Sequence, residues 1–415
     1  MNATGEDNML ALEGLRVLDL TQYEAGTSCT QWLGWLGADV VKVEPTGTGE
    51  PGRFSSGPDP DSGYFVYWNS NKRSVAIDLR QAEGRDLLLR MAPHYDVLAE
   101  NYGPGVMERL GLDYETLRDV HPAIIYASVK GFGGDGPYAS YKCYDMVAQA
   151  AGGAFSMTGT PDGPPMRPGP TLADCGSGLQ LALAITAAYV QKLRDGIGQR
   201  VEVSMQEATT YFLRTLIGGQ GNFGEQAVPR SGNGFGPAQN LYPCAPGGPN
   251  DHLYILAVTP RQQEALCRTI EREDLIPRLG GGLQIDPENH AAGQPVYDEI
   301  AAWTRRHGKY EAMKILGEAG VPSGAVLDSA DLFRDPHLQA RGFIENVEHE
   351  QQGELRVLGC PLRLSASPVE SRGAPLLGRH TEEVLRADLG LSDAEFAKLQ
   401  ASRAIEVREG PLSSR

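Results

Sequence analysis

The sequence predicts an α/β fold: a large domain with a doubly wound, mostly parallel sheet, and a smaller α+β domain. Short apolar runs alternate with helix-patterned segments through the first 130 residues, as in successive βαβ units. A stretch rich in Gly, Asn and Pro interrupts this pattern over residues 217–250. The length of 415 residues also exceeds what one hydrophobic core usually holds.

Apolar runs place the elements of the N-terminal part. Strands are predicted at residues 15–21, 38–44, 74–79, 95–101 and 123–131, and helices at 28–37, 82–94 and 113–120. Ligands of doubly wound sheets bind at the carboxyl ends of the strands, so the polar residues that follow these runs are candidates for a site. The turn after the first strand has the sequence "YEAGTS" and not GxGxxG, so a dinucleotide cofactor is not expected.

The second half of the chain predicts a small domain and a return to the large one. Residues 217–250 are expected to form a linker with mobile loops, and a strand at 253–258 with helical segments to about 320 follows. Two runs at 343–350 and 354–366 predict a hairpin, and the C-terminal segment predicts surface helices. We therefore assign 1–220 and 331–415 to the large domain, and 221–330 to the linker and small domain.

Charge and cysteine usage exclude several classes of partner. The net charge of −16 argues against nucleic acid and against an anionic membrane surface. The N-terminus lacks the order of a signal peptide, and the apolar run 179–190 is too short to span a bilayer. Six cysteines without a CxxC pair and eight histidines without HxH or HExxH spacing predict no metal site. We expect a protein of the reducing cytoplasm.

One carboxylate stands where the longest apolar run begins. Asp174 lies between Ala173 and Cys175, and Asp is favoured at a helix N-cap. The alternative is a nucleophile, because an Asp with a reference pKa of about 3.9 is ionised at neutral pH without an activating base. Gly176 and Gly178 each cost a helix about 1 kcal/mol relative to Ala. That cost makes sense if something large approaches the backbone there.

A family resemblance decides between these interpretations. It is carried by "GLRVLDLTQYEAG", "LGADVVKVEPTGTGE", "NSNKRSVAIDL", "ENYGPGVMERLGL", "ASVKGFGGDGPY", "LADCGSG", "VPSGAV", "DPHLQARG" and "APLLGRHTEEVL". Each stretch is weak alone, but together, in this order and over nearly the whole chain, they are highly specific. The chain resembles the class III CoA-transferases, which include formyl-CoA, carnitine and benzylsuccinate CoA-transferases. The nucleophile of that family aligns with Asp174.

The resemblance implies an activity and an assembly. CoA would move from an acyl-CoA donor to a carboxylic acid through an aspartyl anhydride and an aspartyl-CoA thioester on Asp174, with CoA as co-substrate and no metal or nucleotide cofactor. Succinyl-CoA is a candidate donor, and a dicarboxylic or aryl-substituted succinic acid a candidate acceptor. Relatives form interlocked ring dimers, which implies an intertwined homodimer. A heteromer with a paralogue is the alternative assembly.

The resemblance also assigns site residues. Positions that contact CoA in the family match six residues of this chain, with Arg80, Arg109 and Lys142 at the phosphates and ribose and Ile77, Asn101 and Tyr102 on the adenine side. Tyr144 matches an active-site tyrosine that can donate to a developing oxyanion. Glu24 stands where several relatives carry Gln. A carboxylate near Asp174 would raise one of the two pKa values, pair with an arginine, or discriminate among acids.

Two other functions stay open at this point. An α-methylacyl-CoA racemase shares the fold and the Asp position, but its acid–base chemistry uses a His directly before an Asp. Here the matching pair is Tyr144 and Asp145, and no histidine lies within 20 residues, which argues against racemisation. A non-catalytic subunit of a heteromeric transferase is the second alternative, and retention of Asp174 argues against it.

Overall fold

The computed structural model describes residues 10–57, 61–219, 223–279, 287–408 and 410, with the backbone alone for 287–292. The chain divides into two compact units. The first comprises residues 1–152, 169–211 and 342–415, and the second comprises 153–168 and 212–341. The domain limits at 220 and 330 stay a prediction about independently folding parts.

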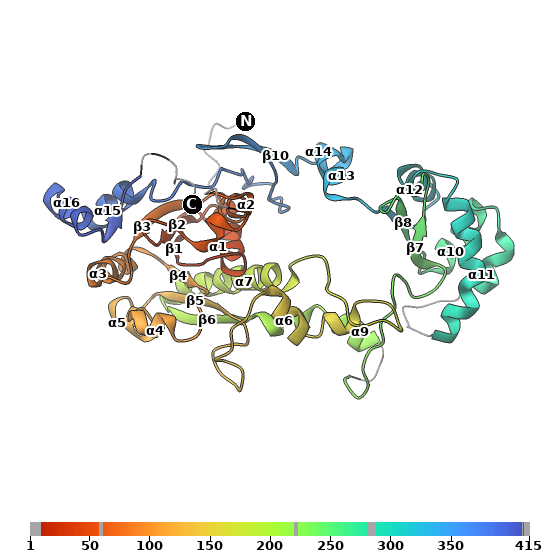
Figure 1. The fold of residues 1–415 in the computed structure, drawn as a ribbon, viewed down its shortest axis with the longest axis horizontal. Helices are drawn as coiled ribbons and strands as arrows, with labels where there is room; N and C mark the ends of the chain where they lie inside the picture. The colour runs from red at the N-terminus through yellow and green to blue at the C-terminus, as the bar shows by residue number, and fades with distance from the viewer. Residues whose placement is uncertain (1–9, 58–60, 220–222, 280–286, 409, 411–415) are drawn as a thin grey trace. The chain divides into compact units, whose positions relative to one another are not determined.

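The first unit contains a seven-stranded sheet in the order β12-β3-β2-β1-β4-β5-β6 (Figure 1). Its strands are β1 (Arg16–Asp19), β2 (Asp39–Glu44), β3 (Arg73–Ile77), β4 (Val97–Glu100), β5 (Ile125–Lys130), β6 (Gln199–Ser204) and β12 (Ile405–Glu406). The pairs from β3 through β6 are all parallel, and β12 runs antiparallel to β3. The chain winds from β1 outward to β3 and then crosses to β4 on the other side. The predicted doubly wound parallel sheet is confirmed.

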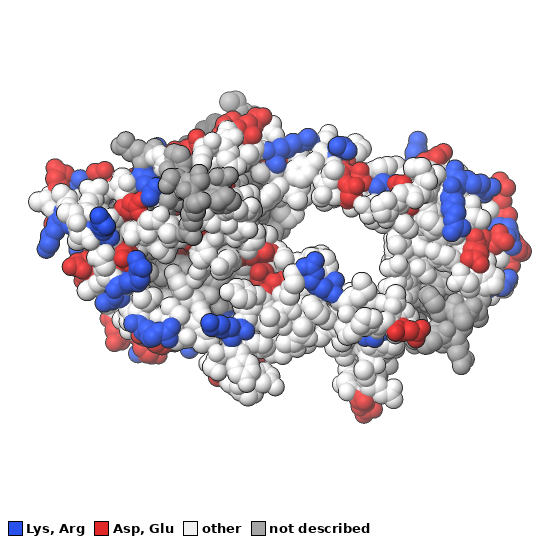
Figure 2. Space-filling view, in the orientation of Figure 1, with Lys and Arg blue, Asp and Glu red and all other residues white. Residues whose placement is uncertain are grey.

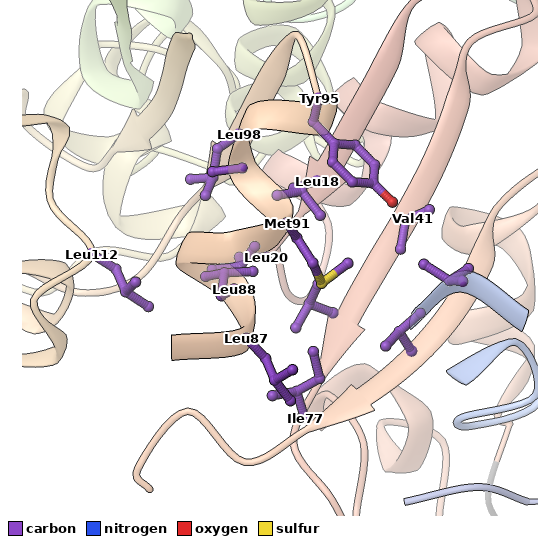
Figure 3. Packing of buried hydrophobic residues seen from close by; sticks show 14 of the residues in the cluster. Leu18, Leu20, Val41, Ile77, Leu87, Leu88, Met91, Tyr95, Leu98 and Leu112 are labelled. Atoms are coloured by element: carbon purple, nitrogen blue, oxygen red, sulfur yellow. The ribbon is translucent and has the colours of Figure 1, made fainter. Parts of the chain in front are cut away.

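Hydrophobic layers cover both faces of this sheet. Successive strand side chains point to opposite faces, so Leu18 and Val41 pack in one layer and Val17 and Val40 in the other. The layer with Leu18 is shown in Figure 3 and packs against α3, α4, α5, α15 and α16. The opposite layer packs against α1 and α7. The helices of this unit are α1 (Ala25–Trp35), α2 (Gly63–Asn69), α3 (Ala82–Met91), α4 (Val106–Leu110), α5 (Tyr114–Val120), α6 (Asp145–Ala151), α7 (Leu172–Asp195), α8 (Met205–Tyr211), α15 (Thr381–Leu389) and α16 (Asp393–Ala401).

Gly178, the second of the two glycines that follow Asp174, lies where helices meet. A Cβ atom at Gly178 would lie 2.6 Å from the carbonyl oxygen of Ala25 and 2.0 Å from the Ser28 hydroxyl, both on α1. The large object that approaches this backbone is therefore a neighbouring helix and not a ligand. The missing side chain lets α7 and α1 pack closely, which offsets the cost of glycine within the helix.

The C-terminal segment contributes more than surface helices. Val384 and Leu385 of α15 have no exposed area, and Phe396 of α16 is 4% exposed. The segment ends in β12, where Ile405 pairs with Ile77 of β3. The prediction of surface helices is wrong in this respect, because a two-residue strand carries no apolar periodicity of its own. The predicted hairpin is confirmed, with β10 (Ile344–His349) antiparallel to β11 (Gly353–Leu358).

The second unit contains a three-stranded antiparallel sheet in the order β7-β8-β9. Its elements are α9 (Arg214–Gly219), β7 (Gln239–Pro243), β8 (His252–Leu256), α10 (Pro260–Thr269), α11 (Pro287–Thr304), α12 (Lys309–Glu318), β9 (Ser323–Ala325), α13 (Ser329–Arg334) and α14 (Pro336–Ala340). Strand β7 lies inside the segment predicted as a linker, so that prediction is wrong for residues 239–243. Residues 220–222 of the same segment lie outside the described residues.

The surface carries both signs of charge. On the face that Figure 2 displays, acidic and basic side chains are interspersed, so the negative net charge is not gathered in one patch there. Among the helices within the described ranges, none has the length and apolarity needed to cross a membrane.

Candidate active site

A cleft of about 370 Å³ opens in the first unit at the carboxyl ends of β1, β4 and β5. Its lining comes from Gln22–Ala25 after β1, Asn101–Pro104 after β4, Val129–Gly131 at the end of β5, Ala139–Tyr144, and Asp174 in the first turn of α7. Strands β1 and β4 are neighbours at which the order of the sheet reverses. A crevice at this reversal point is where doubly wound sheets bind ligands.

The loop after β1 is held in an unusual backbone conformation. Tyr23 has a φ of 58°, in the left-handed region that a bulky residue seldom adopts. Its N–H donates to Glu50 Oε2 at 3.1 Å, and the Asn101 amide pairs with both the N–H and the C=O of Gln22 at 2.8 Å. Strain of this kind costs about 1–3 kcal/mol and persists only where the surroundings fix it. These contacts fix the backbone from which Glu24 enters the cleft.

The first turn of α7 is completed by groups from other elements. Thr171 is the N-cap residue but makes no side-chain cap hydrogen bond, and its hydroxyl lies against Glu24, donating to Oε1. Asp145 of α6 instead accepts from the N–H groups of Ala173 and Asp174, at 3.0 Å and 3.1 Å. Asp174 is thus the third residue of the helix, and the interpretation of Asp174 as the N-cap is wrong.

Asp174 lies in an acidic environment. Burial, followed by the nearby carboxylates of Glu24 and Asp145, raises the pKa of Asp174 to about 8. This raised pKa opposes the expectation that Asp174 is ionised at neutral pH. The expectation from sequence used the reference pKa of an exposed Asp. No pattern in the sequence indicates that two further carboxylates lie close to Asp174 in the fold.

Glu24 is better supplied with hydrogen bonds than Asp174. Its Oε1 accepts from the Thr171 hydroxyl and from the Cys175 thiol, the latter at 3.1 Å, and the residue is 4% exposed. Burial raises the pKa of Glu24, while hydrogen bonds from Thr171, Cys175 and Tyr64 act in the opposite direction. Within the described part of the chain, Glu24 does not pair with an arginine.

The cleft brings together six of the nine residues assigned from sequence: Glu24, Asn101, Tyr102, Lys142, Tyr144 and Asp174. Tyr144 is 66% exposed, and its ring lies edge-on to that of Tyr23 with centroids 6.2 Å apart. The Tyr102 backbone accepts from Lys130, which also pairs with Glu100 at 2.8 Å.

Three assigned residues do not line this cleft. Ile77 has no exposed area and packs in the core beside Leu87 (Figure 3). The Arg80 side chain is 79% exposed and pairs with Asp78 at 2.8 Å. Arg109 is exposed in the last turn of α4.

Sequence reasoning missed the polar groups that hold the cleft in place. Lys72, between α2 and β3, is buried and pairs with Asp19 at 3.0 Å. Asp19 is buried too, and although burial opposes ionisation, Lys42, Lys72 and two threonine hydroxyls lower its pKa to about 2. No signal in the sequence links Asp145 with the start of α7.

The profile of CoA-transferase family III matches residues 12–381 of the chain. The chain belongs to CoA-transferase family III. It is 40% identical to a formyl-CoA:oxalate CoA-transferase of Streptomyces avermitilis, over 95% of this chain and 99% of the relative. A formyl-CoA:oxalate CoA-transferase of Rhodopseudomonas palustris is 38% identical, over 95% of this chain and 97% of the relative.

Solved structures match this family III CoA-transferase along most of its length. A CAIB/BAIF family protein from Brucella suis has a TM-score of 0.77 and 28% identity, covering 91% of this chain and 99% of the other. A protein of Mycobacterium tuberculosis described as hypothetical has a TM-score of 0.74 and 28% identity, covering 92% and 100%. The enzyme is an acyl-CoA:carboxylate CoA-transferase, and its substrates are CoA thioesters and organic acids.

The cleft of this family III CoA-transferase has features that suit such substrates. Its lining holds two carboxyl groups, Glu24 and Asp174, and Asp174 lies at the start of a helix whose N–H groups and dipole favour nearby negative charge. Its rim includes the Lys142 ammonium and two tyrosines, Tyr141 and Tyr144, which are more than half exposed. A thioester carbonyl that approaches Asp174 would therefore meet a carboxyl group and hydrogen-bond donors in one place.

Proposed function

We propose that Asp174 is the nucleophile through which this enzyme moves CoA from an acyl-CoA donor to a carboxylic acid. The observation that carries the proposal is the place of the Asp174 carboxyl, inside the cleft where the strand order reverses. It also stands without a hydrogen-bond donor from any described side chain, so its oxygens are available for attack. The match to CoA-transferase family III along most of the chain supports the same assignment.

The reaction proceeds by exchange of acyl bonds. A carboxylate oxygen of Asp174 attacks the thioester carbonyl carbon, the C–S bond breaks, and CoA leaves as a thiolate from a mixed anhydride. The thiolate attacks the aspartyl carbonyl carbon, the anhydride C–O bond breaks, and the donor acid leaves as a carboxylate. The acceptor carboxylate then reverses both steps and regenerates the Asp174 carboxylate. Because the pKa of Asp174 is raised to about 8, the carboxyl first releases its proton to solvent, and the later steps balance without further proton transfer. Water must be excluded afterwards because hydrolysis would discharge the intermediates.

Other residues of the cleft serve binding and charge stabilisation. Tyr144 donates to the oxyanion that forms on the carbonyl under attack, a role that its exposed position at the rim supports. Glu24 affects which acyl groups and acids bind next to Asp174. Six residues contact CoA: Lys142, Arg109 and Arg80 at the phosphates and ribose, and Asn101, Tyr102 and Ile77 on the adenine side. The last of these assignments requires the core around Ile77 to open, because that side chain is fully buried.

The donor and acceptor are proposed from the relatives. Proteins 38–40% identical to this chain are named formyl-CoA:oxalate CoA-transferases, which supports formyl-CoA as donor and oxalate or a similarly small acid as acceptor. The earlier expectation, succinyl-CoA with a succinic acid derivative, is the second pair to screen. The preference between these acids depends on the side chains around the bound acyl group, where the Glu24 carboxyl lies near that of Asp174.

Racemisation is the weaker candidate. Tyr144 stands where a racemase carries its acid–base histidine, and the carboxylate of the neighbouring Asp145, which is 8% exposed, accepts from two backbone N–H groups of α7. The cleft lining within the described residues contains no histidine. A group that exchanges a substrate proton needs both access and a free oxygen.

We also propose an intertwined homodimer acting in the cytoplasm. One side of α7 exposes Leu179, Leu183, Val190 and Leu193, at 48%, 70%, 57% and 69%. An apolar stripe at this helical spacing is normally covered, so a second copy of the chain is the expected neighbour. Scattering at micromolar concentration should give the mass of a dimer, and a monomer would contradict the proposal. None of the six cysteines forms a disulfide, which is compatible with a reducing compartment.

The decisive experiment traps the intermediate. Incubation with formyl-CoA and then hydroxylamine, without acceptor, should give a hydroxamate on the peptide that contains Asp174. A parallel incubation uses succinyl-CoA. Asp174→Asn should lose both trapping and transfer but keep its fold, because it removes a carboxyl that the folded state holds at a raised pKa. Asp195→Asn, on the exposed end of the same helix, is the matched control. Full transfer activity in Asp174→Asn would contradict the proposed mechanism.

A further inference from the structure

We propose that Asp145 is a positioning residue for the nucleophile: it holds the first turn of α7 in place of a helix cap, and its charge favours the uncharged, acylated state of Asp174. The inference rests on the proposed role of Asp174 and adds a residue that contacts the reacting group only through the backbone. It follows from the contacts of Asp145, from the missing cap of α7, and from the charges that face Asp174.

The contacts of Asp145 account for both of its oxygens. Oδ1 accepts from the N–H groups of Ala173 and Asp174, at 3.0 Å and 3.1 Å. Oδ2 accepts from the side-chain amide of Gln149 at 2.5 Å, within α6 itself. Because Gln149 is 1% exposed and Asp145 is 8% exposed, this arrangement is rigid. The carboxylate therefore ties the N-terminus of α6 to the N-terminus of α7.

Helix α7 needs this support because its own cap is engaged elsewhere. A helix N-cap side chain normally accepts from the N–H of the second or third residue. In α7 these residues are Ala173 and Asp174, but the Thr171 hydroxyl is directed to Glu24. Asp145 accepts from both of these N–H groups, and one of them belongs to the nucleophile. Any movement of the Asp145 carboxylate would thus move the backbone that carries Asp174.

Charge gives Asp145 a second effect on the same residue. The titratable groups that face Asp174 are Glu24 before α1, Asp145 on α6, Cys175 on α7, Tyr64 on α2 and Cys143 before α6. Of these, only Glu24 and Asp145 are carboxyl groups. Their repulsion acts on the Asp174 carboxylate and ceases when that group becomes an anhydride or thioester, which carries no charge. The repulsion therefore shifts the equilibrium toward the acylated enzyme.

Two variants separate the cap from the charge. Asp145→Asn keeps an oxygen that can accept from both N–H groups, while removing the charge. If the Gln149 amide rotates so that its Oε1, which is buried without a partner, faces the new amide nitrogen, the hydrogen bond from Gln149 Nε2 to the Pro170 carbonyl at 3.1 Å is lost. Asp145→Asn should therefore lose some stability. Asp145→Ala removes both cap and charge. Asp135→Asn, an exposed acid outside the cleft lining, is the matched control.

The readouts are ones that a purely structural role would not move. In Asp145→Asn, the pH at which acylation of Asp174 is half-maximal should fall. Less aspartyl-CoA should be trapped at equilibrium at pH values above the pKa of Asp174, where the carboxylate is the form that competes with the thioester. The dissociation constant of free CoA should stay unchanged. Asp145→Ala should lower kcat further and also lower the melting temperature, and Asp135→Asn should match wild type in every measurement.

The outcomes that overturn the proposal are distinct from those that overturn the function. A wild-type pH profile and wild-type trapping in Asp145→Asn would leave Asp145 a structural cap only. If Asp145→Asn does not fold, Asp145→Ser supplies an uncharged acceptor at the same place, and the same two results decide. Failure of the wild-type enzyme to trap any aspartyl species would overturn the role of Asp174 itself, and is measured first.

Discussion

Substitution of Gly178 by Ala should separate the stability of α7 from the position of its nucleophile. Gly178 lies four residues after Asp174, where α7 packs on α1. The new Cβ would stand 2.0 Å from the Ser28 hydroxyl, 2.6 Å from the Ala25 carbonyl oxygen and 3.1 Å from the Cys29 nitrogen. The hydroxyl can rotate away. The carbonyl cannot, because it belongs to the backbone of α1.

The expected size of the effect follows from two opposing contributions. Alanine favours a helix over glycine by about 1 kcal/mol. Ordinary contact begins near 3.4 Å, so the carbonyl and the new Cβ must separate by about 0.8 Å. Overpacking of this kind costs about 1–3 kcal/mol. We expect a net loss of about 1 kcal/mol in the free energy of unfolding, and a larger effect on catalysis, because misplacing a reacting group by about 1 Å can cost about 10²-fold.

The assay measures both quantities in one preparation. Urea unfolding gives the free energy, and exchange between formyl-CoA and oxalate, or whichever pair the acceptor screen identifies, gives kcat/KM. Gly63→Ala at the start of α2, where a Cβ would meet nothing within 4 Å, is the control and should leave activity unchanged. A Gly178→Ala enzyme with wild-type kcat/KM and raised stability would refute the claim that this helix contact positions Asp174.

Three further predictions follow. Asp19→Asn breaks a buried ion pair and should lower the free energy of unfolding by about 3–5 kcal/mol at neutral pH. Because the folded-state pKa of Asp19 is lowered to about 2, the stability that its carboxylate confers is present above about pH 4 and is lost as the pH falls toward 2. Urea unfolding at several pH values checks this. Glu24→Gln removes a carboxylate that raises the pKa of Asp174, so the rise of activity with pH should move to lower pH. The preference among acceptor acids should change as well. If both the pH profile and the acceptor preference match wild type, Glu24 has no role in the site. Arg109→Ala should weaken binding of free CoA in calorimetry, and unchanged affinity with altered acid preference would show that the assignment is wrong.

Much of the large sheet was accessible from sequence because its strands are apolar on both faces. Runs such as 38–44 and 123–131 are buried between two helical layers, so they carry a strong signal. The short strand β12 was missed because its place depends on a partner, β3, that is far away in sequence. Strand β7 was missed because Gly and Pro around it resemble a linker, although antiparallel pairing with β8 holds it in a sheet.

The sequence predicts those parts of the candidate site that depend on the type of a residue. It does not predict the properties that depend on burial and on neighbours from distant parts of the chain. A carboxylate at the start of an apolar helix left an N-cap and a nucleophile as alternatives, and Asp174 could be selected because the family resemblance aligns the nucleophile with it. The raised pKa of Asp174 could not be predicted from the sequence, since two of its causes are the carboxylates of Glu24 and Asp145, which lie 150 and 29 residues away in sequence. Ile77 ends strand β3 as site residues often do, but its side chain is buried in the core.

Strand β12 has a consequence for how the chain is made. On a ribosome, β3 emerges early, yet the strand that covers its outer edge comes last, after Ile405 has been synthesised. At roughly 5–20 residues per second, this edge waits for roughly 16–65 seconds. During that interval β3 offers unpaired backbone groups to any other nascent chain. Newly synthesised protein should therefore depend on chaperones more than the finished enzyme does, and truncation before residue 405 should yield aggregates in place of a slightly shorter enzyme.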